Sequence, residues 1–334
     1  MLYPLLFKPV FKDYIWGGRA LAAFGKTLPS DGIVAESWEI SSHPDGESIV
    51  ANGAFAGQTL TALVNQLGEA LVGNALPPEK VKKFPLLVKL IDARQSLSVQ
   101  VHPDDAFAYK HEDGELGKSE MWYILSALPG AQLVYDVAPG TTRASFAEAI
   151  AAGRVQDCLN YVAVKAGDVI DIPAGMLHAI GEGIVLAEIQ QNSNTTYRVY
   201  DFDRTDANGN TRPLHIEKSL DVIDFDTASH LGIVSPAPQK ISDALIKTNL
   251  VSNDYFTVEK LELDGAMHEH ADGSRFFIYV VLDGSGVITA TNGADPITVA
   301  KGTSVLIPAS LGSYEISGTL TALKAYVPTA SLPE

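Results

Sequence analysis

The sequence is poor in cysteine, in basic residues and in long apolar runs, and each shortage excludes a class of protein. Cys158 is the single cysteine among 334 residues, so no disulfide framework can form within the chain, and we expect a reducing, cytoplasmic compartment. No apolar run approaches the roughly 20 residues that a membrane-spanning helix needs. Pro4, Lys8 and Pro9 interrupt the apolar start of the chain, so we expect neither a signal peptide nor a membrane partner.

Positive charge is scarce as well. Lys and Arg number 24 against 40 Asp and Glu, which gives a formal net charge of -16. Because proteins that bind nucleic acids neutralise phosphates with clustered Lys and Arg, we expect no nucleic-acid partner. A small anionic substrate is not excluded, because charges beyond about 8–10 Å are screened and a pocket feels the groups nearest to it. The sequence gives no indication of the oligomeric state.

What the sequence has in abundance is short β-branched or alternating runs, separated by Gly, Pro, Asn or Asp. Such runs predict strands in 37–43, 84–93, 96–103, 120–125, 131–137, 168–173 and 184–191. Short strands with regular turn signals favour a mainly β fold of jelly-roll barrels over a parallel α/β sheet. Apolar residues make up 46% of the chain, so a large buried core is available to such barrels.

Helical spacing is restricted to a few stretches. Residues 59–73 and 142–162 carry good helix formers at helical spacing, the second with Ser145 or Thr142 as its N-cap. A third, short helix is predicted in 77–83. We therefore expect helical insertions at about 59–83 and 142–162 in an otherwise β structure.

The length of the chain suits two domains. Residues 235–247 are rich in Pro and polar residues, and a new series of strands begins near residue 250. We predict an N-terminal barrel domain over residues 1–245, which contains the helical insertions, and a C-terminal barrel domain over residues 250–334.

Several metal-ligating residue types stand at strand spacing in the N-terminal part. Gln100 and His102 lie two residues apart in a predicted strand, so both side chains leave the same face, which Ser98 shares. Glu120 begins another predicted strand, where a buried carboxylate needs a partner. His178 follows a Pro-x-Gly turn. Each histidine alone could be a core residue, but together the four predict a metal site.

The spacing in 167–178 resembles the second metal-binding motif of the cupin superfamily. It reads Gly, five residues, Pro-Ala-Gly, two residues, His. The first cupin motif, His-x-His followed by Glu, is present with Gln100 in place of its first His. Two imidazoles, a carboxylate and an amide oxygen suit Zn²⁺ or another divalent transition ion, and leave room for water or substrate.

Six segments together carry a resemblance that spans almost the whole chain. They are WGG (16–18), ESWEIS (36–41), PLLVKLIDARQSLSVQVHPDD (85–105), GKSEMWYIL (117–125), PAGMLHAIG (173–181) and EIQQNSNTTYRVYDFDR (188–204). In this order they resemble the type I mannose-6-phosphate isomerases, in their short bacterial form. The resemblance implies a cupin-like double barrel and an enzyme that interconverts mannose 6-phosphate and fructose 6-phosphate through an enediol.

The same resemblance assigns roles to individual residues. It implies one zinc ion per chain, held by Gln100, His102, Glu120 and His178. It also implies that Arg198 is an essential catalytic residue and that Trp16 forms an aromatic wall for the sugar. Lys89, Ser98 and Lys118 fall at positions associated with the phosphate and sugar of the substrate, a small sugar phosphate.

The residue that moves the proton is less clearly marked. Glu188, ten residues before Arg198, is the first candidate for the general base, and Lys118 is the second. Glu188 can equally be a structural carboxylate paired with Arg198 or Arg204. Lys89 lies in an apolar strand, so we expect a ligand or an acidic partner for its ammonium. Asp201 and Arg204 can form an ion pair that braces Arg198.

The C-terminal part resembles a second cupin with a degenerate metal site. His268 and His270 stand two apart, as in a first cupin motif, but Ser274 and Arg275 occupy the region of the expected Glu. In the second motif Ser310 and Ser313 replace its Gly and His. We predict a barrel without a competent metal site.

Two other classes of function remain open at this point. One is another cupin metalloenzyme, such as a dioxygenase or a sugar epimerase, and the other is a non-catalytic sugar-binding cupin. The sequence favours an enzyme, because Arg198 and Lys118 accompany an open metal site, which simple binding does not require.

Overall fold

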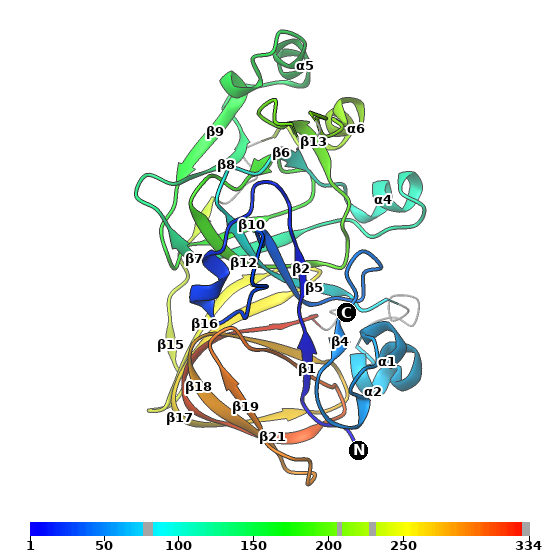
Figure 1. The fold of residues 1–334 in the computed structure, drawn as a ribbon, viewed down its shortest axis with the longest axis vertical. Helices are drawn as coiled ribbons and strands as arrows, with labels where there is room; N and C mark the ends of the chain where they lie inside the picture. Colours follow the sequence, from blue (N-terminus) through cyan, green and yellow to red (C-terminus); the bar gives the residue numbers. More distant parts are fainter. Residues whose placement is uncertain (76–82, 206–208, 227–231, 329–334) are drawn as a thin grey trace, which may run out of the picture.

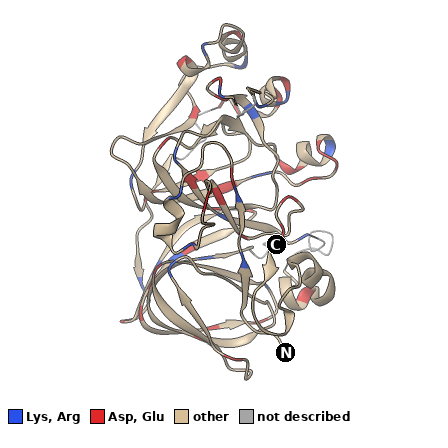
Figure 2. Ribbon diagram, in the orientation of Figure 1, with Lys and Arg blue, Asp and Glu red and all other residues tan. Residues whose placement is uncertain are grey.

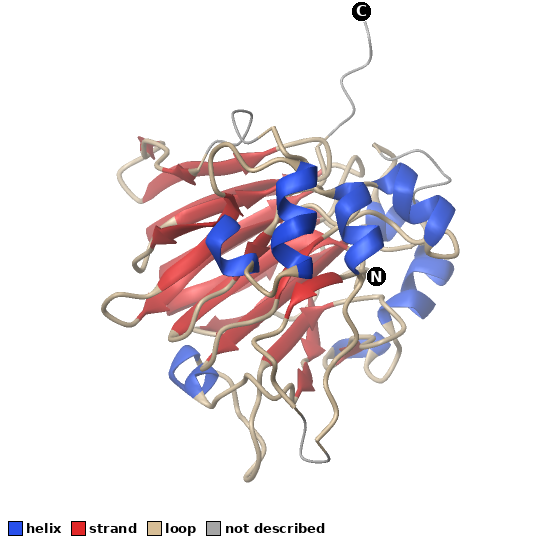
Figure 3. Ribbon diagram, turned by 90° about the horizontal axis from the view of Figure 1, so that it is seen from above, coloured by secondary structure: helices blue, strands red, loops and turns tan. Residues whose placement is uncertain are grey.

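The structure is a computed structural model that describes residues 1–75, 83–205, 209–226 and 232–328. It is mainly β, with two strand-rich halves stacked along the long axis (Figure 1), as the strand pattern predicts. Most of the helices gather on one side of the strands (Figure 3). The helix predicted in 77–83 lies almost wholly outside the described residues. No helix among the described residues is long and apolar enough to cross a membrane.

The C-terminal half is built on the largest sheet, in which all pairings are antiparallel. Its order is β15 (Gln239–Lys240), β16 (Leu245–Ser252), β17 (Thr257–Ala271), β21 (Gly312–Tyr326), β18 (Phe277–Ala290), β20 (Ser304–Ile307), β1 (Leu5–Lys8) and β4 (Ile49–Val50), with β19 (Ile297–Ala300) paired to β18. Two of these strands, β1 and β4, come from the first fifty residues. A boundary near 245–250 therefore divides the sequence but not this sheet.

Two further antiparallel sheets form the N-terminal half and carry the candidate site. The first has the order β14 (Ile233–Val234), β10 (Val169–Ile172), β7 (Glu120–Ala127), β12 (Ile184–Gln191), β5 (Leu86–Ala93), β3 (Glu36–Ile40) and β2 (Val10–Lys12). The second has the order β13 (Tyr197–Tyr200), β6 (Val99–Val101), β11 (His178–Ala179), β8 (Gln132–Val137) and β9 (Leu159–Ala163). All seven strands predicted from the sequence are present.

The helices are short and lie between strands. They are α1 (Leu60–Leu67), α2 (Glu69–Val72), α4 (Asp105–His111), α5 (Arg143–Ala151) and α6 (Ile216–Val222), with 3₁₀ turns η1 (Ala20–Phe24), η2 (Gly53–Phe55) and η3 (Val155–Cys158).

The prediction of one helix over 142–162 is wrong in its second half. Thr142 is the N-cap of α5 and accepts from the Ser145 amide, and Gly153 follows the helix with a φ of +67°. Because that backbone conformation does not continue a helix, the chain turns there. It enters η3 and then β9, which pairs with β8.

The two halves share one apolar core. The outer face of the seven-stranded sheet contributes Val88, Met121 and Ile189, and the C-terminal sheet contributes Ile278 and Leu323. At this junction the Phe84 and Phe276 rings lie 4.6 Å apart between centroids. The C-terminal half therefore covers the side of the N-terminal sheet that faces away from the candidate site.

The interior of the C-terminal barrel holds an ion pair. Strand alternation along β17 turns His268 and His270 outward, with the His268 side chain 80% exposed, and turns Glu269 inward. The Glu269 carboxylate accepts from the Lys324 ammonium at 2.8 Å, and that ammonium lies 4.4 Å from the centre of the Phe277 ring. The two histidines of the cupin-like motif therefore do not face the barrel interior.

Candidate active site and metal centre

Three neighbouring strands align the central residues of the site. His178 of β11 pairs with Gln100 of β6, and Arg198 of β13 pairs with Gln100 from the other side. Residues that are directly opposite in antiparallel strands project from the same face of the sheet. The strand register thus brings together a histidine, an amide and an arginine that are distant in the sequence.

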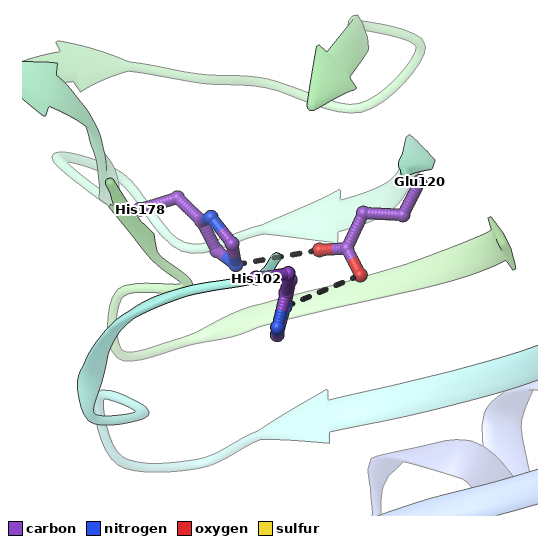
Figure 4. Close-up of side chains that lie close together, drawn as sticks. All are labelled: His102, Glu120 and His178. Atoms are coloured by element: carbon purple, nitrogen blue, oxygen red, sulfur yellow. Dashed lines mark ion pairs between the residues drawn. The ribbon is translucent and has the colours of Figure 1, made fainter. Parts of the chain in front are cut away.

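His102, Glu120 and His178 form a buried group that could hold a metal ion. The Glu120 carboxylate faces both rings, with one oxygen directed at each (Figure 4): its Oε1 is 3.4 Å from His178 Nε2 and its Oε2 is 3.7 Å from His102 Nε2. Gln100 Nε2 lies 3.4 Å from His178 Nε2. Rotation of the Gln100 amide group by half a turn would put its oxygen, a possible metal ligand, where Nε2 now lies. All four residues expected as ligands are therefore at one point in the structure.

Backbone carbonyl groups orient both imidazoles. His102 Nδ1 lies 2.8 Å from the carbonyl oxygen of Thr195, and His178 Nδ1 lies 2.9 Å from that of Met176. Since Nδ1 must donate to a carbonyl, each Nε2 carries a lone pair directed at the centre of the group. Second bonds of this kind fix the tautomer of metal-ligating histidines.

The charge state of the group also fits a cation. Burial, with the nearby Lys118 ammonium, lowers the pKa of His102 and His178, the latter to about 3, so both rings are neutral at pH 7. Burial and the negative charge of Glu188 raise the pKa of Glu120 to about 7. Glu120 Oε1 is buried and has no hydrogen-bond partner among the described residues. Because burial disfavours the ionised carboxylate, a further positive charge would stabilise it, and its Oε1 is the oxygen that could bind a metal ion.

Lys118 lies against this group. Its ammonium donates to Glu120 Oε2 and lies 3.0 Å from His102 Nε2. The side chain is 4% exposed and also lines the adjoining cavity. Lys118 is thus in contact with both the ligand group and the space for a substrate.

A second charged pair, Lys89 and Glu188, lies on adjacent strands of the seven-stranded sheet. Lys89 Nζ is 2.9 Å from Glu188 Oε1, and the Trp122 indole donates to Glu188 Oε2 at 2.9 Å. Burial would raise the pKa of Glu188, but the charges of Lys89 and Lys118, together with hydrogen bonds from Lys89 and Trp122, outweigh it and hold the pKa at about 2. Burial likewise would lower the pKa of Lys89, yet Glu188 and Glu36 raise it above its ordinary value. The expected acidic partner of Lys89 is therefore Glu188, and Glu188 pairs with neither Arg198 nor Arg204.

These groups open into one cavity of about 330 Å³. Its lining includes every residue predicted to be catalytic or substrate-binding, namely Trp16, Lys89, Ser98, Lys118, Glu188 and Arg198. The predicted metal ligand Gln100 also lines it. Trp16 is 3% exposed and lies 5.7 Å from Tyr14 between ring centroids, so two aromatic rings form one wall.

Three arginines gather at one side of this cavity. Arg198 Nε donates to Ser98 Oγ at 3.2 Å, and its Nη1 donates to the Pro213 carbonyl at 2.9 Å. Arg212 donates to both oxygens of Asp201, at 2.8 and 2.5 Å, and Arg204 donates to Asp201 at 2.5 Å, as predicted. Within the described residues Asp201 is the one carboxylate paired with these arginines, so the cluster keeps a surplus of positive charge.

The comparisons with known proteins agree with this geometry. A profile for the phosphomannose isomerase type I catalytic domain matches residues 5–121, and one for the mannose-6-phosphate isomerase cupin domain matches residues 246–327. The chain is 41% identical to the mannose-6-phosphate isomerase ManA of Bacillus subtilis over 94% of this chain and 96% of that protein. It belongs to the type I mannose-6-phosphate isomerase family. The chain is thus an isomerase.

Other relatives extend the likeness. A mannose-6-phosphate isomerase of Streptococcus mutans is 40% identical over 98% of this chain and 99% of that protein. The crystal structure of a mannose 6-phosphate isomerase from Bacillus subtilis matches with a TM-score of 0.87 and 34% identity, and covers 97% of this chain and 99% of that one. The cupin fold predicted from the motifs is therefore confirmed.

The sequence analysis missed five polar residues that line the cavity: Tyr14, Glu36, Asn194, Thr196 and Arg212. Tyr14 precedes Trp16 by two residues, and Glu36 and Asn194 fall within segments that carry the family resemblance. Their positions in the sequence therefore indicated that they could line the site. Arg212 had no such signal, because it reaches the cavity through the loop after β13.

Proposed function

We propose that this chain interconverts mannose 6-phosphate and fructose 6-phosphate in the cavity of about 330 Å³, with a zinc ion held by Gln100, His102, Glu120 and His178. One observation carries the proposal. The cavity joins an arginine cluster with surplus charge to a buried His–Glu–His group, in a chain that is 41% identical to a mannose-6-phosphate isomerase. A phosphorylated sugar needs the first feature for its phosphate and the second for its reacting oxygens.

The phosphate is assigned to the Ser98 and Arg212 side of the cavity. A guanidinium donates two parallel hydrogen bonds to phosphate oxygens, and the arginine cluster has more positive charge than Asp201, its one carboxylate partner among the described residues, neutralises. Lys89 lacks such a surplus, because its ammonium is paired with Glu188 at 2.9 Å. We therefore assign Lys89 to a hydroxyl of the sugar, with Trp16 against the ring.

The reaction moves two hydrogens without net change of composition. A proton leaves C2 of the aldose and is returned to C1, while the hydroxyl proton of O2 is lost and O1 gains one, through an enediol. A zinc ion bound at the ligand group would polarise the substrate oxygens. Arg198, beside Gln100 in the strand register, supplies a fixed positive charge where negative charge develops on oxygen.

Two residues are in place to carry the proton between carbons. Glu188 lines the cavity and stays ionised, but a pKa of about 2 makes it a weak base. Lys118 lines the same cavity next to the ligand group. We keep Glu188 as the first candidate and Lys118 as the second. Near-normal turnover by Glu188→Gln would transfer the role to Lys118.

A coupled assay of mannose 6-phosphate conversion tests the proposal. We expect fructose 6-phosphate to form in oxygen-free buffer, activity to disappear on treatment with a chelator, and zinc to restore it. Oxygen consumption would instead indicate a dioxygenase. Sugar binding without turnover, unaffected by the chelator, would indicate a binding protein, and either result would end the proposal.

A further inference from the structure

A second cavity, of about 280 Å³, lies apart from the first and shares none of its lining residues. It is bounded by the loop after β3, by α1 and by the segment after β12. Phe84 and Val64, both buried, supply apolar wall, and His43, Glu115 and Asn192 supply polar groups. The proposed isomerase reaction uses none of these residues.

Two buried acceptor atoms in this lining have no hydrogen-bond partner among the described residues. Asn192 is 1% exposed, and its Nδ2 donates to Ser42 Oγ at 2.8 Å, which leaves its Oδ1 unpartnered. Glu115 Oε1 accepts from Lys83 at 3.0 Å, while its Oε2 is buried and unpartnered. Because an unmade hydrogen bond on a buried acceptor is costly, the cavity calls for an occupant that donates hydrogen bonds.

His43 narrows the chemistry of that occupant. Its Nδ1 accepts from the Asp45 amide at 3.1 Å, so the hydrogen of the neutral ring lies on Nε2, 3.9 Å from Glu115 Oε2. That gap is too long for a hydrogen bond. An oxygen placed there would accept from Nε2–H and donate to the carboxylate at once, as a hydroxyl does and as neither an ammonium nor a fully ionised anion can.

We propose that this second cavity binds a small neutral molecule with several hydroxyl groups, a sugar or polyol without phosphate. One hydroxyl bridges His43 and Glu115, a second donates to Asn192 Oδ1, and the C–H face packs on Phe84. Phosphate is disfavoured because, among the described lining residues, the two carboxylates of Glu47 and Glu115 stand against one cation, Lys83. The charge preference is thus the opposite of that of the arginine-lined cavity.

The test uses glycerol and mannitol as probes, neither of which can be isomerised, and follows binding to the full chain by ligand-observed NMR. We expect saturable binding that Glu115→Gln weakens about tenfold or more, since a hydrogen bond to a carboxylate is lost. Val64→Phe, which fills the cavity without removing a polar atom, should abolish binding. Arg212→Met, a change in the other cavity, should leave it unaltered.

Three results would overturn the proposal. These are no saturable binding of either probe, binding lost in Arg212→Met but retained in Glu115→Gln, or equal competition by glycerol 3-phosphate. Glu115 is 27% exposed, so its substitution should be tolerated, and circular dichroism of each variant checks its fold.

Discussion

At the scale of single residues, Arg198 is held in place by two acceptors, Ser98 Oγ and the Pro213 carbonyl. If its guanidinium stabilises charge on the substrate oxygen, Arg198→Gln should lower kcat about 10²- to 10³-fold. Metal content, measured by atomic absorption, should stay the same. Arg143→Gln, at an exposed arginine paired with Asp221, is the matched control. Full turnover by the Arg198 variant would remove it from the mechanism.

Arg212 allows the phosphate assignment to be tested separately. Arg212→Met should raise KM for mannose 6-phosphate about ten- to a hundredfold with little change in kcat, because a charged hydrogen bond to phosphate is lost. Arg204→Met serves for comparison, since Arg204 shares Asp201 but does not line the cavity. Steady-state kinetics measure both. Equal effects of the two substitutions would mean that the cluster is only structural.

Glu188 should make the free energy of unfolding depend on pH in the acidic range. Its pKa in the folded chain, about 2, lies below the ordinary value near 4.5, so the folded state favours the ionised form. The stabilisation is present above about pH 4.5 and is lost as pH falls towards 2. Urea unfolding should therefore show Glu188→Gln less stable than the parent chain by a few kcal/mol at pH 7, and the gap should shrink as pH falls from 5 to 3. A gap independent of pH would contradict the pairing with Lys89.

At the scale of elements, strand alternation was the most informative feature of the sequence. Because side chains two apart share a face, Gln100 and His102 could be placed together before any pairing was known. The partner of Lys89 could not, since it depends on the register between β5 and β12, where Lys89 meets Glu188. Arg212 and the second cavity were likewise hidden, because loops bring their residues together.

In the C-terminal barrel, the same alternation of side chains keeps the two histidines of the cupin-like motif out of the barrel interior. His268 and His270 have the spacing of ligands, but their strand turns Glu269 rather than the histidines inward. Motif spacing fixes which residues share a face and not which face it is. The register of the strand within the sheet decides which of the two faces points into the barrel.

The Glu269–Lys324 pair should stabilise this barrel. Glu269→Gln would leave the Lys324 ammonium, 7% exposed, without its carboxylate, and we expect a loss of about 1–3 kcal/mol in the free energy of unfolding. The control is Glu262→Gln, whose more exposed pair with Lys260 should contribute less than about 1 kcal/mol. Urea denaturation measures both. Equal losses would show that burial of the pair is unimportant.

At the scale of the whole molecule, charges of both signs are interspersed along the ribbon (Figure 2), and apolar contacts join the two halves. Phe276 is fully buried and packs on Phe84. Phe276→Ala should cost about 3–5 kcal/mol of stability. Because the core is shared, fluorescence and activity should be lost in one transition on heating. Separate transitions for the two halves would contradict a single cooperative unit.

The pairing of β1 with β20 ties Leu5 to Leu306 and Leu6 to Val305. A ribosome that makes the chain from its amino end produces β4, one neighbour of β1, early, but it must synthesise more than nine-tenths of the chain before β1 can pair with β20 on its other edge. Until then β1 has an open edge, a form in which strands tend to associate with other chains. Tags or deletions at the amino terminus should thus impair the domain at the opposite end of the gene product.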